Sequence, residues 1–432
     1  MLKLPIRKLI LARFGARHCC VSIALLTLLL LPLSCQTLRM TDGRVSVVSE
    51  PAWDRLFQRK EGWTGADVVQ TISLQDGRIL WLFGDTVIGS VQDNKHAPGS
   101  HMVNNSIAIS HSSASGFATA PPADGIRFLW GDKTESGDPS AWIKPGQLKT
   151  ESILVSNDRT SPDTWYWPTG DGIVLADQNE QNRLVLFLSK IKRRDGDYGV
   201  WGFIGGGGSV VIIDNFSEDP ARWVARTYDN PYAVEAWRAD PFSDRFETSW
   251  GMALINGREF EYGQNDYLYI YGIREVTSAR KKMILARSPV GTPERFESWE
   301  FFTQDNTWSP RVQDAFALAD NMVNEFSVDR IKVGSKNIFV MIQSDGAFRN
   351  QILLRTAVRP EGPWSEPAVI YTAAEALNCK DCFAYAAKSH LCLSAPGELL
   401  VSYVVNSSDF NILVNNTDIY RPKFIRVFLN QL

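Results

Sequence analysis

Two aspartates flank a short predicted hairpin near the start of the chain. Asp67 precedes an apolar run that leads into the turn pair Asp76-Gly77, and Asp85 follows the apolar run beyond that turn. A two-residue turn there places Asp85 opposite Val68, so the two carboxylates share one end of the hairpin on opposite faces. A one-residue bulge would bring them to the same face. In such a pair one aspartate can act as a general base while the other adjusts the pKa of that base. The structural alternative is that one aspartate caps a turn or binds backbone amides.

A third carboxylate, Glu325, stands at the start of a later predicted strand. Cleavage of a glycosidic bond needs a proton donor as well as a base or nucleophile. Glu325 is the candidate acid, Asp67 the candidate base or nucleophile, and Asp85 its charge partner or the second catalytic carboxylate. The alternative for Glu325 is a solvated position at the rim of the fold.

Aromatic and polar side chains near other predicted strands are candidates for substrate binding. Trp63, Trp167 and Trp250 are interpreted as stacking platforms for sugar rings, with burial between sheets as the alternative. Asp171 begins a strand close to Trp167, and His390 ends one. His390 is either a functional group or a satisfied structural histidine.

Three cysteines lie near the C-terminus, at Cys379, Cys382 and Cys392. With His390 they form a conceivable zinc half-site, although their spacing does not match the common paired-cysteine sites. A loop disulfide and free buried thiols are the other interpretations. We therefore predict no metal ligand and no cofactor, and leave a structural calcium at the axis of the fold open.

Five short apolar runs organise the middle of the chain. They cover residues 79–84, 184–188, 267–273, 337–342 and 398–405. A turn and another candidate strand precede each run, at residues 66–74, 171–176, 250–256, 325–333 and 385–393. A third strand follows each one, at residues 105–110, 208–213, 282–288, 351–357 and 424–429. Strands that are apolar on both faces must be covered on both faces, as in meanders packed around an axis.

This pattern predicts an all-β protein, a five-bladed β-propeller, with a large β-sandwich as the alternative. The first strand of each blade would line the axis, which is where the candidate residues above are placed. A strand at about residues 44–48 is expected to pair with the last blade, because closing the ring removes exposed strand edges.

The N-terminal segment is basic and then apolar. The first 34 residues hold five basic side chains and no acidic one, and their apolar run of 13 residues is too short to span a bilayer. We predict a lipoprotein-type signal peptide over residues 1–34, lipidation at Cys35, a tether over 35–45 and the propeller domain over 46–432. Plain secretion is the alternative. The expected location is the cell envelope, with a lipid anchor in the outer membrane.

Charge limits the choice of partners. The whole chain has a formal charge of -3, and it becomes more acidic once the basic N-terminal segment is removed. Such a protein is a poor candidate for the phosphate backbone of nucleic acids. The expected partners are a polysaccharide substrate and, through the anchor, a membrane, and the protein is expected to be a monomer.

The stretch from residue 62 to 89, GWTGADVVQTISLQDGRILWLFGDTVIG, followed by Asn104-Asn105-Ser106, resembles the bacterial domain-of-unknown-function family 4185. Part of that family is classed as glycoside hydrolase family 183, endo-acting arabinofuranan hydrolases. Residues 324–327, 387–390 and 418–422 also resemble this group. The segment 355–364, which ends in Gly-Pro-Trp, is similar to the wider clan that includes glycoside hydrolase families 43, 62, 32 and 68.

This likeness extends over the chain from about residue 46. It implies a five-bladed propeller in which Asp67 and Asp85 act in hydrolysis and Tyr420 and Arg421 contact the substrate. We therefore predict an exported glycoside hydrolase that cleaves a furanose-containing, arabinan-like polysaccharide. The alternatives are a non-catalytic carbohydrate-binding propeller and a structural scaffold of the cell envelope.

Overall fold

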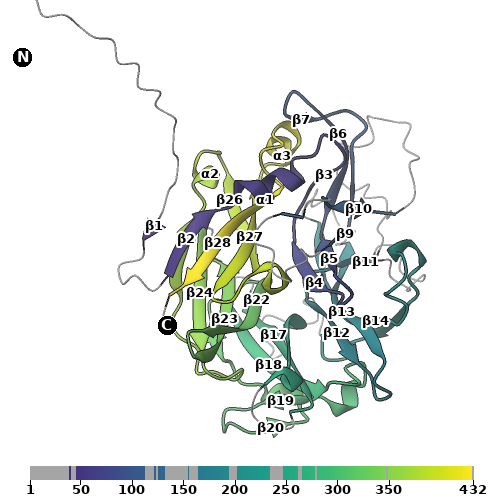
Figure 1. Ribbon diagram of the computed structural model, residues 1–432, viewed down its shortest axis with the longest axis vertical. Coiled ribbons are helices and arrows are strands. Elements are labelled where there is room, and N and C mark those ends of the chain that lie inside the picture. Colours follow the sequence, from purple (N-terminus) through teal and green to yellow (C-terminus); the bar gives the residue numbers. More distant parts are fainter. Residues whose placement is uncertain are drawn as a thin grey trace, which may run out of the picture. The chain divides into compact units, whose positions relative to one another are not determined.

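The computed structural model describes residues 45–111, 121–122, 125–131, 154, 164–193, 202–233, 247–260, 265–277, 280–346 and 349–430, together with the backbone of residues 38–39. By contacts the chain divides after Cys35, and the described residues all lie in the second unit, Gln36–Leu432. The predicted signal peptide and Cys35 lie outside the described residues. Within the second unit the fold is all-β, as predicted, with only short helices (Figure 1).

Five antiparallel meanders make up most of this unit. The first contains β4 (Gln70–Ser73), β5 (Arg78–Phe83), β9 (Ser106–His111) and β10 (Arg127–Leu129). The second contains β12 (Gly172–Ala176), β13 (Asn182–Arg193), β14 (Phe203–Ile213) and β15 (Ala225–Asp229), and β11 (Thr164–Trp167) also pairs with β13. The third contains β16 (Glu247–Asn256), β17 (Tyr267–Thr277), β18 (Arg280–Pro289), β19 (Glu300–Phe302), β20 (Trp308–Ser309) and β21 (Ala319–Asp320).

The fourth meander contains β22 (Phe326–Val333), β23 (Lys336–Ser344), β24 (Gln351–Ala357) and β25 (Ala368–Thr372). The fifth contains β26 (Cys382–Ser389), β27 (Glu398–Ser407) and β28 (Pro422–Leu429). Two N-terminal strands, β2 (Val45–Ser49) and β1 (Leu38–Arg39), complete it. Val45 pairs with Leu429 in the antiparallel β2–β28 ladder, so the predicted pairing of the N-terminal strand with the last meander is confirmed (Figure 1).

A smaller sheet extends the hairpin of the first meander. It contains β3 (Glu61–Ala66), β6 (Thr86–Gln92), β7 (Lys95–His96) and β8 (His101–Val103). The chain runs from β3 into β4 and returns from β5 into β6. Regular pairing is interrupted between these two halves at Asp67 and Asp85, and Val68 there has a positive φ of 46°. The two predicted catalytic aspartates therefore stand at a break in a long hairpin.

Neighbouring meanders share apolar cores. In β13, Leu184 and Leu186 pack in one cluster with Leu80 of the first meander, while Val185 and Phe187 pack in another cluster with residues of the third. Successive side chains of a strand point to opposite faces of its sheet. A strand covered by other sheets on both faces must therefore be apolar at odd and even positions alike. This explains the continuous apolar runs in the sequence.

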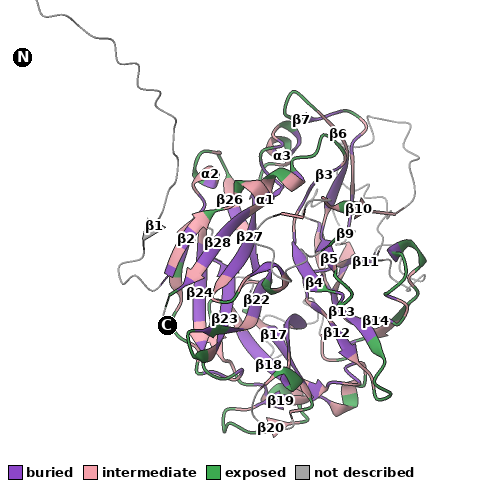
Figure 2. Ribbon diagram, viewed as in Figure 1, coloured by how far each residue is buried: buried purple, intermediate pink, exposed green. Residues whose placement is uncertain are grey.

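The first strands of the meanders contact one another in order, β4 with β12, β12 with β16, β16 with β22 and β22 with β26. The 3-10 turn η9 (Leu391–Leu393), which follows β26, contacts β4. These strands are largely buried, whereas exposed residues concentrate in the turns and the connecting segments (Figure 2). No sheet closes on itself among the strands described.

The helices are short: α1 (Pro51–Asp54), α2 (Ala374–Leu377) and α3 (Phe410–Asn415). Among the residues that the structure describes, no helix has the length and apolar character needed to cross a membrane.

Candidate active site

The first hairpin has a three-residue loop, not the predicted two-residue turn. The N–H of Leu74 donates to the carbonyl oxygen of Arg78, and Gln75 within the loop has a φ of 62°. The register is therefore one residue away from the predicted one. As a result Asp85 lies opposite Asp67 and not opposite Val68: the Asp67 N–H donates to the Asp85 carbonyl oxygen at 3.4 Å. The two carboxylates interact electrostatically without the additional bulge that the predicted register required.

Asp67 is a partly buried carboxylate held by the hydroxyl of Tyr385. The hydroxyl of Tyr385 donates to Asp67 Oδ2 at 2.6 Å, and the Tyr420 hydroxyl is near the same carboxylate but donates to the Asp85 carbonyl oxygen at 3.0 Å. Burial raises the pKa of Asp67 to about 6, and these hydroxyls limit the rise because they stabilise the ionised form. Gly84 leaves room for the carboxylate, because a Cβ at that position would lie 2.4 Å from Asp67 Oδ1.

Asp85 receives a different donor. The indole N–H of Trp167 donates to Asp85 Oδ1 at 2.7 Å, and Asn104 is a further polar neighbour that favours the ionised form of Asp85. Burial, followed by the nearby charge of Asp67, raises the pKa of Asp85 well above its ordinary value. Two carboxylates this close do not ionise independently, so Asp85 favours the neutral form when Asp67 is charged.

Glu325 directly precedes β22, and its Oε2 atom is buried without a hydrogen-bond partner among the described residues. Burial and the charge of Asp67 raise the pKa of Glu325 to about 7, against the opposing effect of Lys388 and Lys281. The pKa of the Tyr385 hydroxyl is raised by burial and by the charges of Asp67 and Glu325. The fold thus brings Glu325 into one electrostatic cluster with Asp67, although far apart in sequence.

Lys388 is the buried cation of this region. It is 0% exposed, and its Nζ donates to the carbonyl oxygen of Thr169 at 2.7 Å. Burial lowers the pKa of Lys388, while the charges of Glu325 and Asp171 raise it. A positive charge at this place stabilises the anion that remains when Glu325 gives up a proton.

Asp171 ties three meanders together. Its Oδ1 accepts from Gln70 Nε2 at 2.6 Å and from the N–H of Gly172 at 2.7 Å, and its Oδ2 accepts from the N–H of Leu254 at 3.0 Å. Burial raises the pKa of Asp171 to about 6, with Lys388 as the main opposing charge. We expected Asp171 to contact substrate, but with both oxygens occupied by protein donors it is a structural residue.

Two of the three expected tryptophan platforms are core residues. Trp63 is 0% exposed and packs against Phe57, Phe83 and Phe128. Trp250 is 5% exposed, and its indole N–H donates to the carbonyl oxygen of Tyr232. Neither ring has a face open to a sugar, so the expectation of stacking is wrong for both. Trp167, which is partly exposed and bonded to Asp85, is the one that lies at the acids.

His390 and Arg421 are also occupied by structural contacts. The His390 ring is 0% exposed, with Thr71 Oγ1 at 3.0 Å and Ser402 Oγ at 2.8 Å from its two nitrogens. Burial lowers the pKa of His390 to about 3, so it stays neutral. Arg421 donates to the backbone carbonyl oxygens of Thr64 and Arg59. The expected substrate contacts of these two residues are therefore corrected. Tyr420 lies beside the acids, but it is 3% exposed and its hydroxyl donates to the Asp85 carbonyl oxygen, so its expected substrate contact is corrected as well.

Three contributors were missed from the sequence: Tyr385, Lys388 and Asn104. Tyr385 and Lys388 flank an irregularity in the β26–β27 pairing, where Ala386 has a positive φ of 55°. Bulges of this kind redirect side chains near functional sites, but they leave no clear sequence signal. Asn104 was part of the Asn-Asn-Ser motif, which offered a usable clue.

The cysteines form a disulfide between Cys379 and Cys382, while Cys392 is free. The loop-disulfide interpretation is thus confirmed, and the zinc half-site is wrong because His390 points to hydroxyls. Burial raises the pKa of the Cys392 thiol to about 12. Across the described part of the chain, no group of three or more His, Cys, Asp or Glu side chains has an arrangement that would hold a metal ion.

Fold and site together define a class: an all-β protein of packed meanders with two neighbouring, partly buried aspartates where the strands of the first meander break. A family model described as "Domain of unknown function (DUF5005)" matches residues 50–429, so the chain belongs to that family. The resemblance to family 4185 and to glycoside hydrolase family 183 is not confirmed by this match. No curated protein matches the chain.

Among solved structures, a "putative hydrolase" from Bacteroides ovatus matches with a TM-score of 0.63 and 21% identity, over 91% of this chain and 94% of that one. This similarity shows a shared fold. A Coprinopsis cinerea GH62 α-L-arabinofuranosidase catalytic domain matches with a TM-score of 0.39 and 9% identity, over 86% of this chain and 92% of that one. A Xanthomonas citri GH43_1 enzyme matches with a TM-score of 0.41 and 12% identity, over 88% and 92%. Similarities this low carry no argument about activity.

Proposed function

We propose that the five meanders are the blades of a five-bladed β-propeller and that the protein is a glycoside hydrolase with its acids at the axis. The circular contacts of the first strands and the β2–β28 pairing support the propeller. The function rests on the asymmetry between Asp67 and Glu325: the Asp67 carboxylate accepts a hydrogen bond from the Tyr385 hydroxyl, whereas Glu325 has a buried oxygen without a hydrogen-bond partner among the described residues.

This asymmetry assigns the roles. Hydrogen-bond donors favour the ionised form of Asp67, so Asp67 acts as base or nucleophile. The pKa of Glu325 is raised to about 7, so this residue still carries its proton in mildly acidic solution. It acts as the acid that protonates the leaving oxygen. Asp85 adjusts the charge of Asp67, with Trp167 holding its carboxylate in place. Lys388 stabilises Glu325 after it has given up its proton.

We propose as substrate a furanose-containing, arabinan-like polysaccharide of a cell envelope. The support is the resemblance of residues 62–89 and of Asn104-Asn105-Ser106 to endo-acting arabinofuranan hydrolases. The partly exposed Trp167, whose indole N–H donates to Asp85, is the residue placed to meet a sugar there.

Incubation with a panel of arabinans and other envelope polysaccharides, followed by product analysis, tests this proposal. Asp67→Asn and Glu325→Gln are each expected to lower kcat about a hundredfold or more, the contribution of a positioned acid or base. Asp214→Asn is a matched control, because that carboxylate is exposed and pairs with Arg226. Sugar binding without any product from the unaltered protein would instead support the alternative, a non-catalytic carbohydrate-binding propeller.

We further propose export and lipid attachment at Cys35, based on the basic segment, the apolar run of 13 residues and the Leu-Pro-Leu-Ser-Cys sequence that ends it. Mass spectrometry of the native protein should find a lipid-modified N-terminal Cys35. An unmodified N-terminus beyond residue 35 would contradict the anchor but not export.

A further inference from the structure

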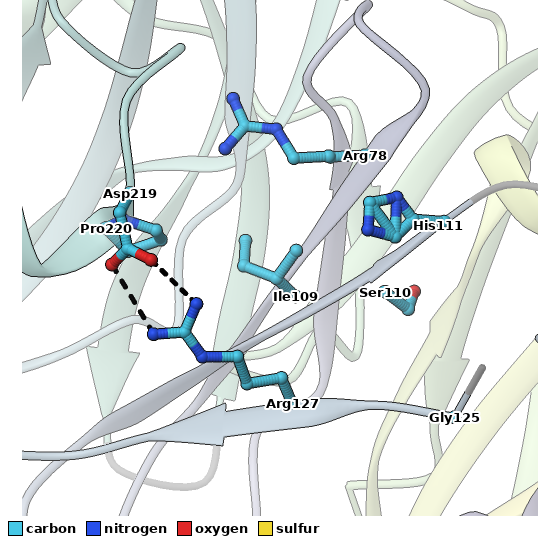
Figure 3. Close-up of a pocket in the computed structure, with 8 residues that line it drawn as sticks. All are labelled: Arg78, Ile109, Ser110, His111, Gly125, Arg127, Asp219 and Pro220. Carbon is cyan, nitrogen blue, oxygen red and sulfur yellow. Dashed lines mark hydrogen bonds and ion pairs between the residues drawn. The ribbon is translucent and has the colours of Figure 1, made fainter.

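A concave site lies at the end of the first meander that is remote from the acids. A pocket of about 370 Å³ is lined by Arg78, Ile109, Ser110, His111, Gly125, Arg127, Asp219 and Pro220 (Figure 3). Arg78 begins β5, whereas Asp85 follows the end of that strand. Seven residues of extended chain separate them by about 23 Å, so the pocket is distinct from the carboxylate cluster. Its volume lies in the range of small-molecule sites.

An ion pair forms one wall of the pocket. Arg127 Nη1 donates to Asp219 Oδ2 at 2.7 Å and Nη2 donates to Oδ1 at 3.5 Å (Figure 3). Asp219 is itself fixed, because its Oδ1 accepts from the N–H of Ala221 at the start of the 3-10 turn η4 (Pro220–Arg222). The two side chains are 60% and 40% exposed, and a pair this exposed contributes little to stability. What it does provide is a fixed row of donors and acceptors facing the pocket.

The rest of the lining is close to neutral. Arg78 is held by Asp76, to which its Nε donates at 2.9 Å, and by the carbonyl oxygen of Phe216. Each arginine therefore already has a carboxylate partner, which disfavours an anionic ligand. The ring of His111 also lines the pocket, while Ile109 and Pro220 supply apolar surface.

We propose that this pocket is a non-catalytic binding site for a neutral sugar residue of the polysaccharide, and this inference rests on the proposed function. Neighbouring hydroxyls of a sugar donate to a carboxylate and accept from a guanidinium, which is the pairing that Asp219 and Arg127 present. The C–H face of the ring fits against Ile109 and Pro220. A site so far from the acids holds a remote part of the chain and raises the local concentration of cleavable bonds.

Two tryptophans allow the two sites to be observed separately by NMR. The indole N–H of Trp81 donates to Ser110 Oγ at 2.9 Å, and Ser110 lines the pocket. The indole N–H of Trp167 donates to Asp85 and reports on the acids. Short neutral arabinan oligosaccharides and, separately, oligogalacturonates are titrated into ¹⁵N-labelled Asp67→Asn protein, so that the ligand is not consumed.

The neutral sugars should shift the Trp81 indole signal. Arg127→Ala should raise the dissociation constant obtained from this shift about tenfold or more, because charged hydrogen bonds are lost. Asp219→Asn, which retains the cap of η4, should weaken it similarly. Arg226→Ala is the matched control, because it removes a comparably exposed Arg–Asp pair outside the pocket.

A shift of Trp167 without Trp81 would overturn the second site and leave the proposed function standing. A Trp81 shift without Trp167 would support the second site and count against the proposed substrate at the acids. A Trp81 response to oligogalacturonate alone would overturn the assignment to a neutral sugar. Equal affinities in the Arg127→Ala variant and the unaltered protein would also overturn it.

Discussion

Removing one hydroxyl tests the assignment of Asp67 as the ionised group. Tyr385→Phe deletes the donor that lies 2.6 Å from Asp67 Oδ2 and keeps the aromatic ring. A hydrogen bond to a charged group contributes about 1.5–3 kcal/mol. Since 1.36 kcal/mol corresponds to about one pKa unit, the loss should raise the pKa of Asp67 by roughly 1–2 units. The Tyr420 hydroxyl, which donates to the Asp85 carbonyl oxygen, is left in place.

The consequence is a displaced pH profile. In the unaltered protein the rate should rise as Asp67 ionises, with a pKa of about 6, and fall as Glu325 loses its proton, with a pKa of about 7. In Tyr385→Phe the acidic limb should move to higher pH. At pH values well below the pKa of Asp67, kcat/KM should drop about tenfold to a hundredfold, with a much smaller loss above neutrality.

The assay is kcat/KM for a soluble arabinan oligosaccharide as a function of pH, together with melting curves. Tyr403→Phe is the matched control, because that hydroxyl bonds Glu375 and not the acids. The control should leave the acidic limb in place. A uniform loss of rate at every pH in Tyr385→Phe would refute the reasoning, since a merely structural tyrosine would produce it. An unchanged acidic limb would refute it as well.

Three further predictions follow from the same contacts. Burial raises the pKa of Glu325 from 4.5 to about 7, so its contribution to stability is complete below its ordinary pKa and is lost as the pH rises through about 7. Glu325→Gln should therefore stabilise the protein by on the order of 1–3 kcal/mol at pH 8 and by much less at pH 4, as measured by thermal unfolding. Equal stabilisation at the two pH values would contradict this. Gly84→Ala places a Cβ 2.4 Å from Asp67 Oδ1 and should remove most turnover, and full activity would show that the carboxylate need not stay there. Deleting residues 36–50 removes the strand that pairs with β28 and should lower the melting temperature by several degrees, whereas an unchanged value would make this segment a tether only.

Much of the fold could be predicted because it depends on local pattern. Each strand that is covered on both faces must be apolar at odd and even positions alike. The runs at residues 184–188 and 398–405 can therefore be recognised as strands from the sequence alone. The strands before and after them were also placed, since turns rich in Gly, Asn and Asp separate them. The pairing of β2 with β28 followed from the need to protect strand edges.

The register of the first hairpin could not be predicted with the same certainty. Asp76-Gly77 is compatible with loops of two and of three residues, and a difference of one residue decides which side chain faces Asp85. The backbone conformation of Gln75 and Val68, both with positive φ, settled that choice in the folded chain. Local sequence does not encode it strongly, because neither residue type favours that conformation.

The roles of individual side chains depended on tertiary structure still more. Trp63 and Trp167 look alike in the sequence, yet the first packs in the core and the second bonds a carboxylate. The sequence by itself determined the strands and the identity of the acidic residues, because periodicity and residue type are local properties. Only the tertiary structure decided that Tyr385 meets Asp67 and that Glu325 lies beside them. Burial and distance set a pKa, and both arise from packing between strands that are remote in the chain.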